Sequence, residues 1–274
     1  MKESIVRALS GIVYILVLVS ATFFSEVTFV LLFAFFMLIA ITEFCRLVNY
    51  KPVLPYIIAL ALLALFIYAE DYRELLTNIF ISISVIVNSI LLYQLFNKRP
   101  PRALTRTLKL VKVIGYIILP FLLIMRLPYL TKCAGGFIFV PDFIISIFIL
   151  IWINDTFAYI TGKSFGKHKL FERISPKKTV EGFAGGMVFT IAGAVILSIY
   201  LKIFGLPHWI ATGIIVVIFG TLGDLVESRF KRLAGVKDSG NIMPGHGGIL
   251  DRLDSIIFAI PFLFLYYQII HYVS

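Results

Sequence analysis

Long apolar segments separated by short polar ones repeat along the whole chain. A membrane-spanning helix needs about 20 largely apolar residues, within a range of roughly 17 to 25. By this measure the pattern predicts nine spans, at residues 7–24, 27–45, 53–69, 75–96, 110–129, 137–160, 180–201, 208–227 and 252–272. We therefore expect an all-α, polytopic membrane protein that lies in the lipid bilayer.

The composition agrees with this pattern. Of the 274 residues 60% are apolar, and the mean hydropathy is +0.98, far above that of a soluble domain. The first apolar run, 9–24, has the basic start of a signal peptide, but it lacks a small-residue cleavage site, so we expect a retained helix. No internal repeat stands out. We expect a single membrane domain, with N-terminal helices over residues 1–130 and catalytic helices and loops over 137–274.

Positive charge is distributed unevenly between the two sides of the predicted spans. With the N-terminus in the cytoplasm, all but four of the 25 lysines and arginines fall in cytoplasmic segments. The four on the outer side are Arg73, Arg126, Lys132 and Lys202. Since positive charge is retained on the cytoplasmic face, this bias predicts a cytoplasmic N-terminus and an outer C-terminus. The net charge of +10 is spread over loops beside the lipid headgroups, so we expect no nucleic-acid partner.

One polar segment, residues 224–255, stands out between two apolar runs and holds five acids. Asp224, Glu227 and Ser228 share one helix face, and Asp251, Asp254 and Ser255 repeat the spacing. Such carboxylates could hold a hard divalent cation such as Mg2+, or could form ion pairs with Arg229, Arg232 and Arg252. The two cysteines, Cys45 and Cys133, have no ligand spacing, so neither a disulfide framework nor a zinc site is indicated.

The segment PGHGG, residues 244–248, lies between these two sets of acids. Its glycines suit a place where the backbone approaches another group closely. His246 could contact phosphate or move a proton, or it could be purely structural. There is neither a P-loop nor a dinucleotide-binding motif, so those nucleotide folds are not expected.

Two further segments lie upstream, near the predicted cytoplasmic ends of spans. Asp155 follows a long apolar run, where an acid is costly unless it is paired, hydrated or metal-bound; it could also be a helix-terminal carboxylate. In SPKKTVEG, residues 175–182, Ser175 and Pro176 suit a helix start, which would place Glu181 in the first turn. Lys177 and Lys178 could hold phosphate there, or could belong to an ordinary basic loop. The glycines that follow, Gly182, Gly185 and Gly186, could form a close helix-packing face.

The order of residues in the polar segment is distinctive. It runs over 27 residues and comprises Ser228, Lys231, Arg232, Lys237, Asp238, the PGHGG segment with Gly247 and Gly248, Asp251, Arg252 and Asp254. This arrangement resembles the signature of the phosphatidate cytidylyltransferases, also called CDP-diacylglycerol synthases. The upstream segments NDTFAY (154–159) and SPKKTVEG are similar to that family's, which extends the resemblance over roughly residues 150–255.

The resemblance implies a reaction in which CTP and phosphatidic acid give CDP-diacylglycerol and pyrophosphate, with Mg2+ as cofactor. It also implies a membrane homodimer in the cell inner membrane, with a polar cavity that opens to the cytoplasm and laterally to lipid. We expect catalytic roles for Asp224, Asp251, Lys178 and His246, and metal ligands among Asp224, Asp251, Asp254 and Asp155. The expected substrate-binding residues are Lys177, Lys178, Glu181, Ser228, Lys231, Arg232, Lys237, Asp238, Gly247, Gly248 and Arg252.

Three other functions compete with this interpretation. A CDP-alcohol phosphotransferase also clusters Asp and Gly at the ends of spans, but its pattern is absent because Asp224 is followed by Leu225. A CTP-dependent polyprenol kinase is closer, and would release CDP instead of pyrophosphate. A cation transporter would place its acids near the middle of the bilayer, whereas these acids lie at the predicted inner ends of the spans.

Overall fold

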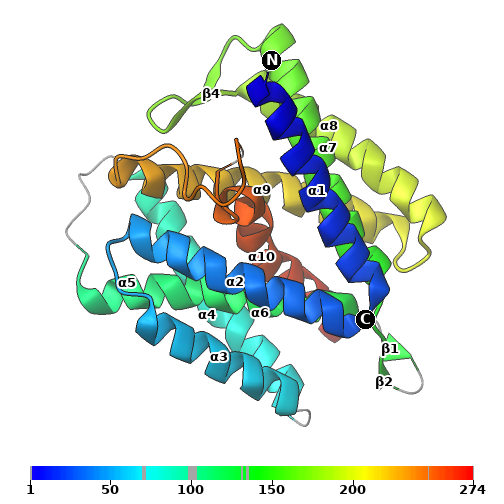
Figure 1. Ribbon diagram of the computed structural model, residues 1–274. Helices are drawn as coiled ribbons and strands as arrows, with labels where there is room; N and C mark the ends of the chain where they lie inside the picture. Colours follow the sequence, from blue (N-terminus) through cyan, green and yellow to red (C-terminus); the bar gives the residue numbers. More distant parts are fainter. Residues whose placement is uncertain are drawn as a thin grey trace.

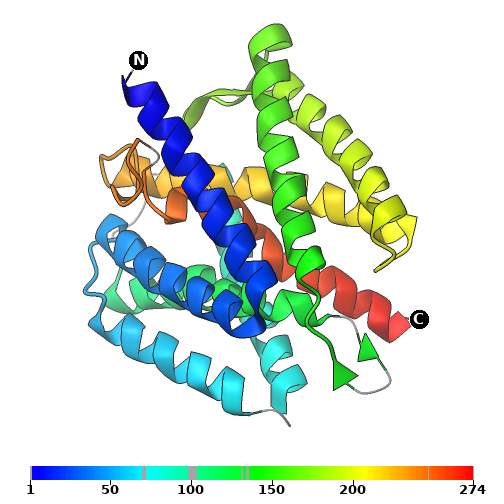
Figure 2. The same ribbon diagram turned by 45° about the vertical axis from the view of Figure 1, so that its right-hand side comes forward.

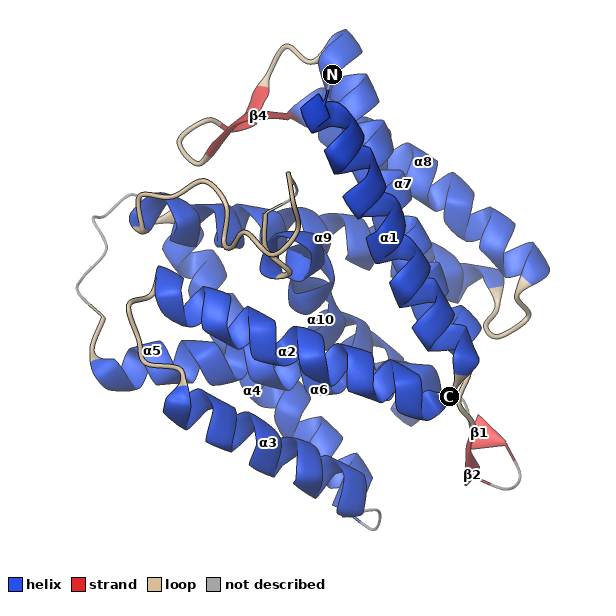
Figure 3. Cartoon of the chain, in the orientation of Figure 1, coloured by secondary structure: helices blue, strands red, loops and turns tan. Residues whose placement is uncertain are grey.

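The structure is a computed structural model that describes residues 2–69, 72–97, 104–130, 132–133, 136–245 and 247–273. Helices make up most of the described chain (Figures 1 and 3). In order, the elements are α1 (Lys2–Phe24), α2 (Glu26–Leu47), α3 (Val53–Tyr68), α4 (Arg73–Phe96), α5 (Arg106–Lys112), the π-helix η2 (Val113–Ile118), α6 (Leu119–Arg126), the short helix η3 (Leu127–Tyr129), β1 (Lys132–Cys133), β2 (Gly136–Phe137), α7 (Pro141–Phe165), β3 (Lys169–Phe171), β4 (Ser175–Thr179), α8 (Val180–Tyr200), α9 (Leu206–Leu233) and α10 (Leu250–Val273).

Each predicted apolar span corresponds to one helical rod in the described residues. The fifth rod runs without interruption from Arg106 to Tyr129 and comprises α5, η2, α6 and η3. It lies against α2, α4 and α10, and most of its side chains are buried, so it forms the centre of the N-terminal half. The prediction of an all-α membrane protein is confirmed.

Two of the nine rods, α1 and α3, have shorter apolar segments than the others. Seven helices among the described residues are long and apolar enough to cross a membrane. The remaining apolar helical segments are Leu9–Phe24 within α1 and Val53–Tyr68, which is α3. With 16 residues, α3 is about 24 Å long at 1.5 Å per residue, less than the roughly 30 Å hydrocarbon core. The crossing of the membrane by these two helices stays a prediction.

The chain ends and the connections separate into two groups (Figures 1 and 2). The N-terminus, the β3–β4 hairpin and the loop between α9 and α10 lie at one end of the molecule. The C-terminus, the β1–β2 hairpin and the α8–α9 turn lie at the other. The two polar segments that the sequence singled out are therefore on the same side.

Glycines bring α7 and α8 together. A Cβ on Gly185 would lie 2.3 Å from the Thr161 hydroxyl oxygen, and a Cβ on Gly182 would lie 2.7 Å from the carbonyl oxygen of Ala158. Both contacts are too close for any side chain larger than hydrogen. The helix-packing interpretation of these glycines is confirmed, because backbones approach closely in membranes where small residues line the interface.

The start of α8 differs from the prediction. Ser175–Thr179 is strand β4, which pairs antiparallel with β3 through the partners Lys169–Thr179 and Phe171–Ser175. The helix begins at Val180, and Thr179 caps it by accepting a 3.1 Å hydrogen bond from the backbone N–H of Gly182. The expected helix start at Ser175 and Pro176 was therefore wrong, because strand pairing uses those residues, whereas Glu181 does lie in the first turn.

Candidate active site

Two glycines on α9, Gly220 and Gly223, allow α10 to pack closely against α9 near Asp224. A Cβ on Gly223 would lie 2.5 Å from the Cβ of Phe258 and 2.7 Å from the carbonyl oxygen of Asp254, and Gly220 faces Ser255. This close approach brings Asp224 and Glu227 of α9 to Asp254 of α10, with one carboxylate oxygen from each within 4.8 Å of the others. Three carboxylates are thus assembled from helices separated by a loop.

Lys178 from the hairpin reaches this cluster. Its ammonium forms an ion pair with Asp224, whose other carboxylate oxygen accepts a 3.1 Å hydrogen bond from Ser228. In a strand, successive side chains point to opposite faces, so Lys177 is exposed and only Lys178 faces α9. The hairpin and the polar segment therefore form one site, as their shared side of the molecule suggested.

Asp155 of α7 faces the same space. It is exposed, and its charged neighbours are Lys178, Asp224 and Arg252. Asp254 is buried and has Asp224, Lys178 and Asp155 among its neighbours. Charged groups from α7, β4, α9 and α10 are therefore neighbours in this region: Asp155, Lys178, Asp224, Arg252 and Asp254. A ligand bound here would meet negative carboxylates as well as positively charged side chains.

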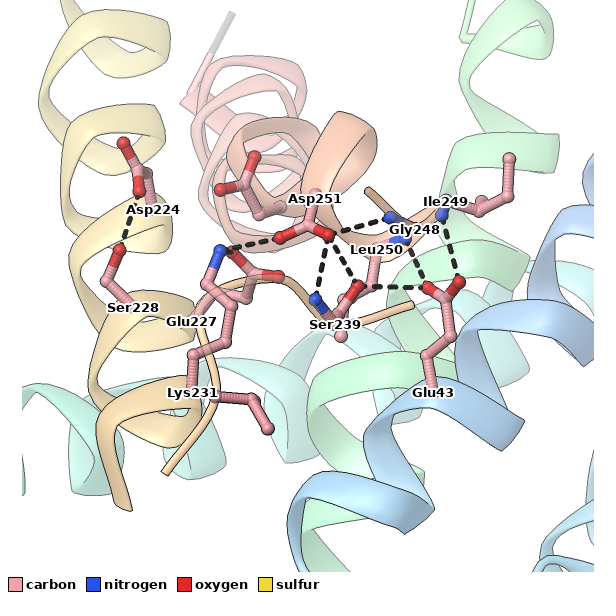
Figure 4. Close-up of polar contacts among 12 residues, drawn as sticks. Glu43, Asp224, Glu227, Ser228, Lys231, Ser239, Gly248, Ile249, Leu250 and Asp251 are labelled. Carbon is pink, nitrogen blue, oxygen red and sulfur yellow. Dashed lines mark hydrogen bonds and ion pairs between the residues drawn. The ribbon is translucent and has the colours of Figure 1, made fainter. Parts of the chain in front are cut away.

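Lys231 joins the two acidic helices. Its ammonium lies 2.5 Å from Glu227 Oε2 and 2.6 Å from Asp251 Oδ1 (Figure 4). The side chain of Glu227 is fully buried. The second Asp251 oxygen accepts hydrogen bonds from the backbone N–H groups of Gly248 and Ser239, both at 2.8 Å, and from the Ser239 hydroxyl at 2.9 Å. Both oxygens of Asp251 are thus engaged with the protein, and the carboxylates that gather with Asp224 are Glu227 and Asp254.

A buried acid from the N-terminal half completes this network. Glu43 of α2 accepts hydrogen bonds from the backbone N–H groups of Leu250 at 2.8 Å and Ile249 at 3.1 Å, and from the Ser239 hydroxyl at 3.1 Å (Figure 4). The two backbone donors lie at the start of α10, where N–H groups have no partner within the helix. Sequence reasoning missed Glu43, although an acid in the apolar segment 27–45 is itself a signal.

Two glycines of the PGHGG segment, which we call the glycine loop, lie close to the carboxylates of Asp251 and Glu43. Gly247 has a φ of +83°, and a Cβ there would lie 2.5 Å from Asp251 Oδ2. A Cβ on Gly248 would lie 2.3 Å from Glu43 Oε1. The expectation that backbone approaches another group closely here is met, and these groups are carboxylates of the protein itself. His246 lies outside the described residues.

Glu181 has a contact of its own at the base of the hairpin. It accepts hydrogen bonds from the His168 backbone N–H at 3.2 Å and lies 2.6 Å from the ring Nδ1 of the same residue. It thereby ties the hairpin loop to the first turn of α8. Its predicted role in substrate binding stays a prediction.

The other predicted substrate-binding residues differ in their exposure. Arg232 donates a 3.1 Å hydrogen bond to the carbonyl oxygen of Val236, within its own loop. Asp238 lies beside Gly247. The exposed members of the predicted set in this region are Arg232, Lys237, Asp238 and Arg252, whereas Ser228 and Gly248 are buried. The expected ion pairs of the acids with Arg229 and Arg232 are not among those described; lysines take that place.

The acidic cluster fits a hard divalent cation. All three groups offer oxygen atoms, the donors that such cations prefer. Glu227 Oε1 is buried and has no hydrogen-bond partner among the described residues, which costs free energy unless a ligand supplies the missing interaction. A bound cation would satisfy this oxygen and would offset the repulsion among the three carboxylates.

The chain matches a known protein family over most of its length. The model of the "Cytidylyltransferase family" matches residues 5–270, nearly the whole chain. The chain belongs to the cytidylyltransferase family. Membership of this family makes it a nucleotidyltransferase, and the fold places that enzyme in a membrane.

Relatives of this cytidylyltransferase cover the same length. A protein of Staphylococcus haemolyticus is 35% identical over 262 residues, which are 94% of this chain and 96% of the relative. One of Bacillus subtilis is 34% identical over 270 residues, covering 94% and 95%. One of Staphylococcus aureus is 50% identical over 123 residues, 44% of this chain and 47% of the relative. Each of the three is named phosphatidate cytidylyltransferase.

Proposed function

We propose that this chain is a phosphatidate cytidylyltransferase, which makes CDP-diacylglycerol and pyrophosphate from CTP and phosphatidic acid for phospholipid biosynthesis. In this reaction an oxygen of the lipid phosphate forms a bond to the α-phosphorus of CTP, and the bond from that phosphorus to the β-phosphate bridging oxygen breaks. The attacking phosphate is already an anion, so no nucleophilic side chain is needed. Catalysis then comes from positioning and from neutralising charge.

The observation that carries this proposal is the meeting of an acidic cluster with a hairpin lysine in a membrane-embedded cytidylyltransferase. A cluster of Asp224, Glu227 and Asp254 can hold a cation against a polyphosphate. Lys178, already at the cluster, supplies an ammonium group for the same phosphates. A site with both features is suited to a triphosphate, and the surrounding apolar helices suit a lipid as the second substrate.

We assign Mg2+ to the acidic cluster, with Asp224 and Asp254 as its ligands and Glu227 behind them. Asp155, which has Asp224 among its charged neighbours, is our candidate ligand for a second cation. Mg2+ bound here would neutralise phosphate charge and align the α-phosphorus with the attacking oxygen. Asp251 remains a candidate ligand from the sequence, but its four hydrogen-bonded contacts better support a role in fixing Lys231 and the glycine loop.

The cations at the rim would meet the phosphates as they arrive. Lys177, Arg232, Lys237 and Arg252 are exposed around the site and carry charge of the required sign. His246, between the glycines of the loop, is a further candidate for phosphate contact. The long side chains of these residues can follow the substrates, whereas the carboxylate cluster is fixed by two packed helices.

A direct assay tests the function. Purified protein receives CTP labelled in the cytosine, dispersed phosphatidic acid, and either Mg2+ or EDTA. We expect labelled CDP-diacylglycerol and one pyrophosphate for each lipid product, in the presence of Mg2+ only. Release of CDP with phosphorylation of an added polyprenol would show a kinase instead, and an absence of labelled lipid would disprove the proposal.

We further propose that the site faces the cytoplasm of the inner membrane and that the enzyme is a homodimer. The cytoplasmic orientation is supported by the cations that the sequence places at this end. Labelling a Lys177→Cys variant, in which Cys45 and Cys133 are replaced by serine, with a membrane-impermeant maleimide tests it. The variant should react in inverted vesicles and not in intact spheroplasts. Cross-linking and light scattering in detergent test the dimer. A monomer mass at all protein concentrations would contradict it.

A further inference from the structure

Tyr14 lies on α1, in a part of the chain that the resemblance did not cover. Its ring packs on Phe36 of α2, with the ring centroids 6.1 Å apart and the planes inclined by 29°. Its hydroxyl oxygen is buried and has no hydrogen-bond partner among the described residues. A buried hydroxyl without a partner costs about 1–3 kcal/mol, so such a group in a well-packed helix calls for an explanation.

Tyr14 lies near the active site. The charged groups around Tyr14 are Arg252 and Asp254, which belong to the first turns of α10 and to the acidic cluster. One turn earlier on α1, the Ser10 hydroxyl donates a 3.0 Å hydrogen bond to the carbonyl oxygen of Pro244 in the glycine loop. Figures 1 and 2 both show α1 crossing in front of α9 and α10. Tyr14 therefore lies on a helix that borders the site, beside the loop that contains Pro244.

The position of α1 indicates which substrate lies beside the hydroxyl. The opposite face of α1 presents exposed apolar side chains, including Ile12 and Leu16. In a membrane these contact lipid chains, so α1 is the boundary between the site and the bilayer. A nucleotide that enters from the aqueous side meets the hairpin first. A phosphate carried by a membrane lipid comes from the bilayer side and meets α1.

We propose that the Tyr14 hydroxyl donates a hydrogen bond to an oxygen of the lipid phosphate, with Arg252 on the same phosphate, and so holds the attacking group beside the acidic cluster. The proposal rests on the proposed function, since it assigns part of that site to the lipid phosphomonoester. It makes α1 a part of the substrate-binding machinery. The phenol is suited to this role because it donates one hydrogen bond at neutral pH and carries no charge that would hold the phosphate too strongly.

The test compares Tyr14→Phe with the unchanged protein in mixed micelles, where the surface fraction of phosphatidic acid and the CTP concentration are varied separately. Loss of one hydrogen bond to a charged group should raise the KM for phosphatidic acid roughly tenfold. The KM for CTP and the Mg2+ concentration for half-maximal rate should change less than twofold. A matched control is Tyr267→Phe, which loses a 2.6 Å hydrogen bond to Thr212 away from the site and should leave all three constants unchanged.

The outcomes separate this proposal from the proposed function. If the unchanged protein makes no CDP-diacylglycerol, the proposed function fails whatever the variant does. If it is active and Tyr14→Phe keeps the KM for phosphatidic acid, the assignment of Tyr14 is overturned. A change in the CTP or Mg2+ constants alone would also overturn it, because the hydroxyl would then serve the nucleotide or the carboxylates. A thermal unfolding midpoint equal to that of the unchanged protein would show that the effect is not a folding defect.

Discussion

The Glu43 carboxylate and the Leu250 backbone N–H, 207 residues apart in sequence, are joined by a 2.8 Å hydrogen bond. The bond links α2 to the first residue of α10, the helix that carries Asp251 and Asp254. Through Ser239, Asp251 and Lys231 the same network continues to Glu227 in the acidic cluster. The N-terminal helices therefore support the geometry of the site, even though the resemblance to the family in the sequence is concentrated in the second half.

Removal of Glu43 should loosen this support. In Glu43→Ala the backbone N–H groups of Ile249 and Leu250 lose their acceptor while buried, which should cost about 3 kcal/mol of stability and most of the activity. Glu43→Gln keeps one acceptor oxygen, so its stability and activity should lie between those of the unchanged protein and those of Glu43→Ala. Thermal unfolding in detergent and initial rates measure both effects. Glu172→Gln, an exposed acid in the hairpin, is the control, and equal losses in it would count against a specific role for Glu43.

The acidic cluster predicts a strict requirement for its carboxylates. Asp224→Asn and Asp254→Asn should each lower turnover by at least about 100-fold, because each removes a charged oxygen ligand without changing the side-chain size. Expression should be retained. The thermal unfolding midpoint should be equal or higher, since repulsion among the three carboxylates is reduced. Near-normal turnover at saturating Mg2+ in either variant would remove that residue from the cation site.

Removal of the cation should be reversible. EDTA should abolish turnover, and excess Mg2+ should restore it. Ca2+ should support less turnover, because it is larger and takes more ligands in a looser geometry than Mg2+. Full activity in EDTA after dialysis would contradict the assignment of the cluster. Rates measured against free metal concentration give the result.

The strand conformation of β4 predicts different effects for its two adjacent lysines. Lys178→Met should lower kcat/KM for CTP by about 10- to 100-fold, because it removes the ammonium that faces Asp224. Lys177→Met should lose less, since that side chain points to the opposite, exposed face. Lys163→Met, an exposed lysine at the end of α7, is the matched control for net charge. The reverse order of effects for the two strand lysines would contradict the register of the hairpin.

Close packing of α9 on α10 predicts a steric effect. In Gly223→Ala the added methyl group would meet Phe258 at 2.5 Å, so the helices must separate, at a cost of about 1–3 kcal/mol. The same separation would move Asp224 away from Asp254 and lower activity. Gly205→Ala, at the other end of α9, meets only ordinary contacts at 3.8 Å and should change little. Thermal midpoints and turnover of the two variants can be compared directly.

The apolar pattern predicted the helices well because burial in lipid demands an uninterrupted apolar run, which is visible locally. It also placed the SPKK segment and the polar segment on one side. It could not distinguish a strand from a helix start at Ser175, since the deciding hydrogen bonds come from pairing with Lys169–Phe171. Nor could spacing show that Glu227 gathers with Asp224 and Asp254 while Asp251 is held by Lys231 and backbone groups. Both outcomes depend on contacts between segments that are far apart in the sequence, which local patterns do not show.

The reach of Glu43 across the chain has a consequence in time. A ribosome that adds about 5–20 residues per second completes Leu250 roughly 10–40 s after Glu43. For most of that interval the carboxylate has none of its partners, while α2 and the helices that follow it enter the membrane. The site therefore cannot assemble progressively from its first helix, and it acquires its final form only when the last helix arrives.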